Sequence, residues 1–147
     1  KKAIVSHTGT NKETAAQKNA GTLEVEYVPQ GTLAERIRAY GAGLGGVLTP
    51  TGLGTIIQDG KQIINVDGKD YILEKPLKAD IAFLRANIVD EDGNMVFLGT
   101  TQNFNPLMAM AADYVVVEAE KLVKNGEIAP EQIHASGIFV DGIYLEK

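Results

Sequence analysis

The sequence predicts an open α/β fold with a mostly parallel sheet and helices on both faces. Stretches with helix-capping signals alternate with short apolar segments, as in β–α–β units. Two apolar segments, residues 79–89 and 114–119, are nearly continuous, which is typical of strands covered on both sides. Residues 55–74 carry two Asp-Gly turns and predict a small antiparallel β-meander, made of three short strands, inserted into this fold.

The first elements form a β–α–β unit. Residues 3–5 and 23–28 predict strands, the second from its alternation of apolar and acidic side chains. Between them, Thr10 and Glu13 have the spacing of a capping box, and Gly21 suits the position just after a helix.

The clearest helix covers residues 32–40. Thr32 and Glu35 form a second capping box, and Gly41 can end the helix. A glycine-rich loop, residues 41–55, leads from it to the meander.

The second half predicts further strands and one helix. A turn at Asp92-Gly93 precedes a short strand, residues 95–99. Asn105 is expected to cap a helix with Pro106 at its first position and a body over residues 107–112. Residues 121–136 predict a connector with one helical turn after Pro130, and residues 137–145 a final strand pair.

Composition excludes several classes of function. The 147 residues carry a net charge of −5, and their 14 Lys and Arg are scattered, so no cationic surface for nucleic acid is expected. No apolar run is long enough to cross a bilayer. Cysteine is absent, which excludes a cysteine nucleophile or thiolate metal site in this chain and fits a reducing, cytoplasmic compartment.

Residues Gly41–Gly46 match the dinucleotide pattern G-x-G-x-x-G. That pattern binds a pyrophosphate only where a strand precedes the glycines and a helix follows them. Here the predicted helix comes first and Pro50 follows, so we reject an NAD site. Two interpretations stay open for the loop: an irregular connection with tight turns, or a wall of N–H groups for phosphate or acyl oxygen.

Two other segments are candidate binding elements. Asn103, Phe104 and Asn105 lie just before a predicted helix, where free N–H groups favour an anion or carbonyl; the alternative is an ordinary Asn cap. Gln30 follows a strand end, where open α/β sheets bind ligands; the alternative is an amide bonded to the backbone. No metal site is expected, since His7 and His134 lack partners at ligand spacing and residues 90–94 predict a turn.

Four long blocks carry a resemblance to a known family. They are SHTGTN, VPQGTLAERIRAYGAGLGGVLTPTGLGT, LEKPLKADIAFLRA and TTQNFNPLMAMAADYVVVEAE. Together they resemble the α subunit of class I coenzyme A transferases, of the type that uses acetate or butyrate and acetoacetate. The likeness covers residues 1–147 and implies the later part of an α-subunit domain of the CoA-transferase, NagB/RpiA-like fold, because the family's upstream Gly-Gly-Phe segment has no counterpart here.

The resemblance implies a chemistry and a partner. In the family a glutamate of the β subunit, in a Ser-Glu-Asn-Gly motif that this chain lacks, attacks an acyl-CoA and passes through a glutamyl-CoA thioester. It therefore implies an α–β heteromer, expected as α2β2, with acyl-CoA and a short-chain acid as substrates and no permanently bound cofactor.

The resemblance also ranks the candidate substrate-binding residues. Gln30 is the first choice for contacting the acyl or carboxylate group. The second choices are Gly43, Leu44, Gly45, Gly46, Asn103, Phe104 and Asn105. The alternatives are a CoA-ester hydrolase or sugar-phosphate isomerase on the same scaffold, or a non-catalytic fragment of the transferase.

Overall fold

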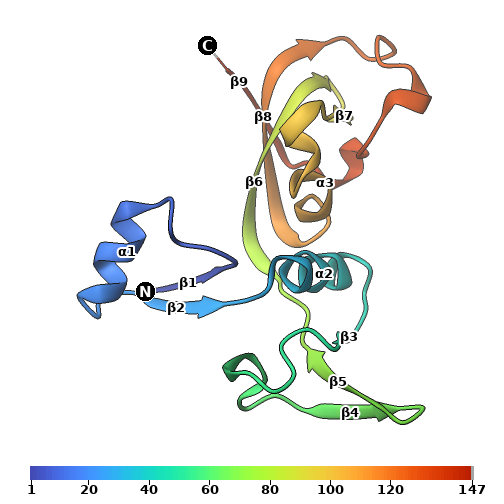
Figure 1. The fold of residues 1–147 in the computed structure, drawn as a ribbon. Helices are drawn as coiled ribbons and strands as arrows, with labels where there is room; N and C mark the ends of the chain where they lie inside the picture. The colour runs from blue at the N-terminus through green and yellow to red at the C-terminus, as the bar shows by residue number, and fades with distance from the viewer. Residues whose placement is uncertain (147) are drawn as a thin grey trace. The chain divides into compact units, whose positions relative to one another are not determined.

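The computed structural model describes residues 1–146 (Figure 1). The chain forms two compact units. The first unit takes Lys1–Arg36 and Gly45–Pro76, and the second takes Ile37–Leu44 and Leu77–Lys147.

The first unit opens with the expected β–α–β element. Strands β1 (Lys2–Val5) and β2 (Glu24–Tyr27) pair in parallel, with α1 (Lys12–Asn19) between them in the chain. The helix begins one residue later than predicted, because the side chain of Asn11 rather than Thr10 accepts the hydrogen bond from the Thr14 N–H. Asparagine is at least as good a cap as threonine, so the neighbouring residue displaces the predicted one.

Helix α2 (Gln30–Gly41) begins two residues before its predicted cap. The Pro29 carbonyl already accepts from the Leu33 N–H, and Thr32 lies buried within the first turn. The helix ends in a Schellman motif: the Gly43 N–H donates to Tyr40 O and the Leu44 N–H to Ala39 O. Gly43, with φ +69°, is therefore the left-handed residue that closes the helix, a role predicted for Gly41.

A small three-stranded antiparallel sheet is confirmed in this region, but it is not a meander, because β5 lies between β3 and β4, and one of its strands is not the predicted one. Strands β3 (Val47–Thr49), β4 (Ile63–Val66) and β5 (Lys69–Glu74) pair in the order β3-β5-β4. The strand expected at its start is wrong, since Ile56–Gln58 form a 3-10 turn capped by the Thr55 hydroxyl. The third strand, β3, instead lies inside the glycine-rich stretch of residues 41–55.

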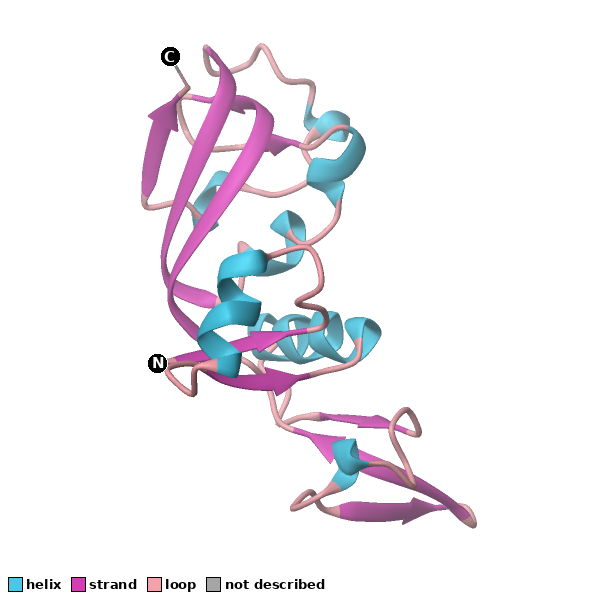
Figure 2. Cartoon of the chain, turned by 60° about the vertical axis from the view of Figure 1, so that its left-hand side comes forward, coloured by secondary structure: helices cyan, strands magenta, loops and turns pink. Residues whose placement is uncertain are grey.

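The second unit is built on a four-stranded sheet (Figure 2). Its order is β7-β6-β8-β9, with β6, β8 and β9 parallel and β7 antiparallel to β6. The strands are β6 (Ala79–Asp90), β7 (Met95–Val96), β8 (Ala112–Val123) and β9 (Gly142–Leu145). A mostly parallel sheet in an α/β chain is thus confirmed.

One face of this sheet carries the core. Alternate side chains of β6 and β8 pack there against β7 and the segment that follows it. The buried set is Ala82, Leu84, Ala86, Val89, Met95, Phe97, Ala109, Val115, Val117, Ala119 and Ala135.

The opposite face of the sheet is not covered by the described residues of the second unit. Ile81 and Phe83 of β6 are 52% and 73% exposed, and Tyr114 of β8 is also exposed. The expectation that residues 79–89 and 114–119 are covered on both sides is therefore wrong within the described chain. An apolar run indicates that a strand can be covered on both faces. It does not show whether the residues that cover it belong to the same part of the chain.

Two predicted elements near the C-terminus are shorter than expected. Helix α3 (Asn105–Met108) is only four residues long, and Phe104, not Asn105, occupies its cap position. Residues Gly137–Phe139 form a 3-10 turn, so the expected strand pair reduces to β9 alone. The helical turn after Pro130 is confirmed as a 3-10 turn, Pro130–Gln132.

Candidate functional site

The first candidate lies where β2 ends and α2 begins. Gln30 is the first residue of α2, is exposed, and makes no side-chain hydrogen bond within residues 1–146. It follows the carboxyl end of a parallel strand, where open α/β sheets bind their ligands. An amide in this position is free to donate to an oxygen of a bound molecule without bringing a charge.

A polar cluster that the sequence analysis missed lies at the same end of β2. The Tyr27 hydroxyl lies 2.9 Å from Thr8 Oγ1 and 3.1 Å from Lys18 Nζ. The hydrogen bond with Thr8, and then the Lys18 ammonium, hold the pKa of the Tyr27 phenol below its ordinary value of 10.0. The signal available in the sequence was that Thr8 lies just past the end of one strand and Tyr27 at the end of the next.

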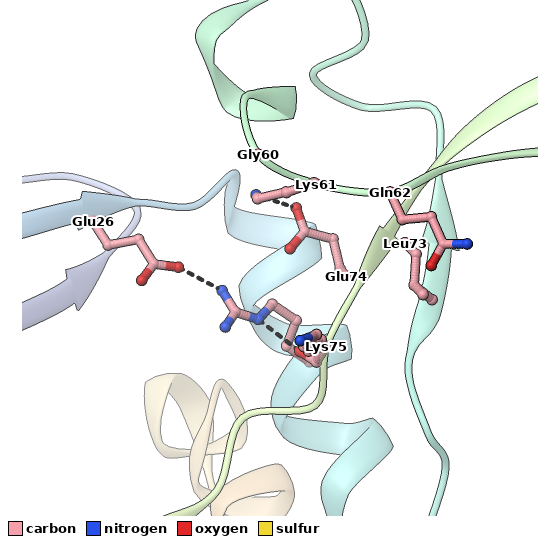
Figure 3. A pocket seen from close by; sticks show the side chains of 8 residues that line it. Glu26, Gly60, Lys61, Gln62, Leu73, Glu74 and Lys75 are labelled. Carbon is pink, nitrogen blue, oxygen red and sulfur yellow. Dashed lines mark hydrogen bonds and ion pairs between the residues drawn. The ribbon is translucent and has the colours of Figure 1, made fainter.

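A polar pocket of about 400 Å³ lies within the first unit (Figure 3). Arg36 of α2 crosses it: Nη1 donates to Glu26 Oε1 at 2.9 Å, and Nε donates to the Lys75 carbonyl at 2.9 Å. Glu26 also receives Lys2 Nζ at 2.9 Å. The pKa of the Glu26 carboxyl is lowered from its ordinary 4.5, first by the hydrogen bond from Lys2 and then by that from Arg36.

A second ion pair lines the same pocket. Lys61 Nζ lies 2.6 Å from Glu74 Oε1, and Glu74 is only 2% exposed. A buried carboxylate needs a partner of opposite charge, and Lys61 provides it for Glu74. Each of the two carboxylates of the pocket is thus bound by a cation.

The side chain of Asn105 attaches the NFN segment, residues 103–105, to neighbouring backbone. Asn105 Oδ1 accepts from the Arg85 N–H at 3.1 Å, and Asn105 Nδ2 donates to the Thr101 carbonyl at 2.9 Å. The expectation that Asn105 caps α3 is therefore wrong, because its side chain is turned to the backbone of β6 and of the preceding turn. Asn103 is exposed and its side chain makes no hydrogen bond within the described residues.

The predicted site residues fall into both units. Gln30, Gly45 and Gly46 belong to the first unit, while Gly43, Leu44 and the NFN segment belong to the second. Within the second unit, Gly41 lies against Met110, so the start of the glycine loop and the segment after α3 are adjacent.

No metal centre is formed by the described residues: no three His, Asp or Glu side chains among residues 1–146 could share an ion. His134 Nδ1 instead accepts from the Phe97 N–H at 3.0 Å. The Asp90 carboxylate accepts from the N–H groups of Asp92 and Asn94, which confirms residues 90–94 as a turn.

Comparison with known proteins decides the family. Residues 1–146 match the family model described as "Coenzyme A transferase". The chain is 48% identical over 147 residues to the acetate CoA-transferase subunit alpha of Escherichia coli K12. It is 52% identical over 146 residues to the acetoacetyl-CoA:acetate/butyrate CoA transferase alpha subunit of Clostridium acetobutylicum. The chain belongs to the coenzyme A transferase family.

The match covers nearly all of this chain and part of its relatives. The coenzyme A transferase chain spans 67% of the length of each of these two proteins. Among solved structures, the thioester complex with CoA of an acyl-CoA transferase from E. coli O157:H7 matches 98% of this chain and 32% of that one. Its TM-score is 0.87 at 23% identity, which supports the open α/β fold. None of the helices described in residues 1–146 is long and apolar enough to span a membrane.

In this coenzyme A transferase, Gly41, Gly43 and Gly46 have structural explanations. A Cβ on Gly41 would lie 2.6 Å from Met110 Cβ, and a Cβ on Gly46 would lie 2.8 Å from the Glu74 carbonyl oxygen. Gly43 closes α2, and no helix follows the glycines to receive a pyrophosphate. The arrangement supports the rejection of an NAD site.

Proposed function

We propose that this chain is the α-type subunit of a CoA-transferase that moves CoA between short-chain acids of the acetate, butyrate and acetoacetate class. The observation that carries the proposal is the 48–52% identity, over essentially the whole chain, to two subunits whose names state that activity. The names of those two relatives state their substrates, and we infer that this chain acts on acids of the same class.

The attacking carboxylate is proposed to come from a β-type subunit. This chain lacks the Ser-Glu-Asn-Gly motif of the family resemblance. Its two pocket carboxylates, Glu26 and Glu74, are each bound by a cation. A partner chain, in an α2β2 assembly, would therefore supply the nucleophile.

The reaction follows a ping-pong course. The partner's glutamate attacks the thioester carbonyl, so that the C–S bond breaks and a mixed anhydride and CoA thiolate result. The thiolate then attacks the glutamyl carbonyl of the anhydride, which releases the first acid and leaves a glutamyl-CoA thioester. The second acid takes CoA by the reverse sequence.

This chain's share of the work is to bind and orient the substrate. In both directions negative charge develops on an acyl oxygen, and a fixed neutral donor stabilises it. The Gln30 amide is the proposed donor. Gly43, Leu44, Gly45 and Gly46, together with Asn103 and Phe104, are proposed to line the site, and Asn105 to hold Phe104 and Asn103 in place.

The test is to trap the intermediate. The chain is co-expressed with its β-type subunit, incubated with acetyl-CoA, and treated with borohydride, which reduces a glutamyl thioester to an alcohol. We expect mass spectrometry to find the reduced glutamate on the partner and none on this chain. In a parallel assay with acetyl-CoA and acetoacetate, net CoA release without transfer to acetoacetate would show a hydrolase. A reduced glutamate on this chain would overturn the division of labour.

A further inference from the structure

Hydrogen bonds hold the segment from β7 to α3 on both sides of its exposed turn. Before the turn, Gln102 Nε2 donates to the Phe97 carbonyl, and the Leu98 N–H donates to Thr101 Oγ1 at 2.9 Å. After it, Asn105 binds the Arg85 N–H of β6. Between these attachments only Asn103 and Phe104 have side chains without a hydrogen bond in the described chain.

Asn87 of β6 is the centre of this attachment. Its Oδ1 lies 2.7 Å from the Leu98 N and 2.7 Å from Thr101 Oγ1, and both donate to it. Its Nδ2 donates to Glu120 Oε2 of the neighbouring strand β8 at 2.9 Å. One half-buried amide thus links two strands to the start of the turn that ends in the NFN segment.

We propose that Asn87, acting through Thr101, is a positioning residue of the transferase that fixes the Asn103–Phe104 turn at the substrate. The inference rests on the proposed function. A turn that contacts a reacting group must be held to a fraction of an ångström, and displacements of about 1 Å can cost about 100-fold in rate. Side chains that hold such a turn without touching the substrate supply that precision.

The hydrogen bonds of Asn87 connect to both sides of the Asn103–Phe104 turn. Its bonds converge on Leu98 and Thr101, and the Thr101 carbonyl in turn accepts from Asn105 Nδ2 at 2.9 Å. A change at Asn87 is therefore transmitted to both ends of the turn. The apolar core on the other face of the sheet does not depend on these bonds.

The experiment uses the complex of this chain with its β-type subunit. Asn87→Ala and Thr101→Val are compared with wild type in single-turnover formation of glutamyl-CoA from acetyl-CoA. Asn65→Ala is the control, because the Asn65 amide likewise uses both of its ends: Nδ2 donates to Asp70 and Oδ1 accepts from the Gly68 N–H, in the β4–β5 hairpin. We expect the two test variants to react about tenfold more slowly or worse at saturating acetyl-CoA. We expect KM for acetyl-CoA and the melting temperature to match those of the control.

A second pair of variants tests the link to β8. Asn87→Asp keeps both acceptor bonds but places a carboxylate against that of Glu120, so we expect slow turnover. Adding Glu120→Gln provides a donor and should restore the rate.

The outcomes are distinguishable. No glutamyl-CoA from the wild-type complex overturns the proposed function and this inference with it. Wild-type activity together with unchanged single-turnover rates in Asn87→Ala and Thr101→Val overturns the inference alone. Rates that fall only in proportion to lost folded protein also overturn it, since that is the result of a purely structural role.

Discussion

At the scale of single residues, the proposed site depends on side chains that have no hydrogen-bond partner within residues 1–146. Gln30 is exposed at the start of α2. The amide of Asn105, another candidate site residue, instead makes hydrogen bonds to the backbone at both of its ends. The Gln30 amide is therefore the better candidate for a substrate contact. The Asn105 amide, which bonds to the backbone at both ends, is the better candidate for holding the turn in place.

Replacing Gln30 tests this distinction. In the α–β complex we expect Gln30→Ala to lower kcat/KM for CoA transfer by about 100-fold or more, the usual effect of removing one donor to a developing oxyanion. Gln17→Ala is the control, because Gln17 is a glutamine of α1 bonded only to Glu13 through its side chain. Initial rates of acetyl-CoA conversion with acetoacetate give the measurement. Full activity in Gln30→Ala would remove Gln30 from the site.

Gly41 illustrates a residue whose type is set by packing rather than by a ligand. We expect Gly41→Ala to lower the free energy of unfolding by about 1–2 kcal/mol, because its methyl group would overlap Met110, partly offset by the better helix propensity of alanine. Gly45→Ala has no atom within 4 Å of the new methyl group and should be near neutral. Urea denaturation of both variants provides the comparison; equal midpoints would contradict the packing explanation.

At the scale of elements, Glu26 joins three parts of the first unit. It lies on β2 and binds Lys2 of β1 and Arg36 of α2. Loss of its charge would therefore loosen both the parallel strand pair and the attachment of α2 through Arg36.

The pH dependence of stability follows from the lowered pKa of Glu26. A carboxyl whose pKa is lower in the folded state than in the unfolded state stabilises the fold above the unfolded value of about 4.5. That contribution disappears as the pH falls from 4.5 through the folded value. We expect Glu26→Gln to be less stable than wild type at pH 7 and to show a smaller loss of stability on acidification. Denaturant titrations from pH 7 to pH 3 measure this, and parallel curves for the two proteins would contradict it.

The elements also show what could be predicted from sequence. Strong local signals sufficed for β1, β2, α2, β6 and β8, and four long blocks sufficed for the family. Boundaries failed where two residues compete for one role. Asn11 displaced Thr10 as a cap, and Gly43 displaced Gly41 as the end of a helix.

The candidate site was less predictable, because side-chain partners come from distant parts of the chain. Asn105 bonds to Arg85, twenty residues earlier, and Tyr27 to Thr8, nineteen residues earlier. The strand β3 was missed for a similar reason: its partner β5 follows β4 in the chain, and its own three residues follow glycines. Local patterns do not specify such pairings.

At the scale of the whole molecule, the sheet of the second unit has one face packed and one bare. Parallel strands with exposed apolar side chains are unusual, since parallel sheets are normally covered on both faces. On the bare face Ile81 and Phe83 of β6 lie beside Tyr114 and Val116 of β8 in the pairing register. An exposed apolar patch of this kind promotes association.

We therefore expect the 147-residue chain to self-associate as its concentration rises, and Phe83→Ser to reduce this. Because Phe83 is 73% exposed, its replacement should leave the free energy of unfolding nearly unchanged. Ile138→Ser is the matched control: Ile138 is 84% exposed but lies on a 3-10 turn outside the patch, so we expect no change in association. Leu84→Ser, one residue along β6 on the packed face, should unfold the unit instead. Sedimentation velocity over a concentration series gives the answer, and equal association by the Phe83 and Ile138 variants would show that the bare face of the sheet is not the surface responsible.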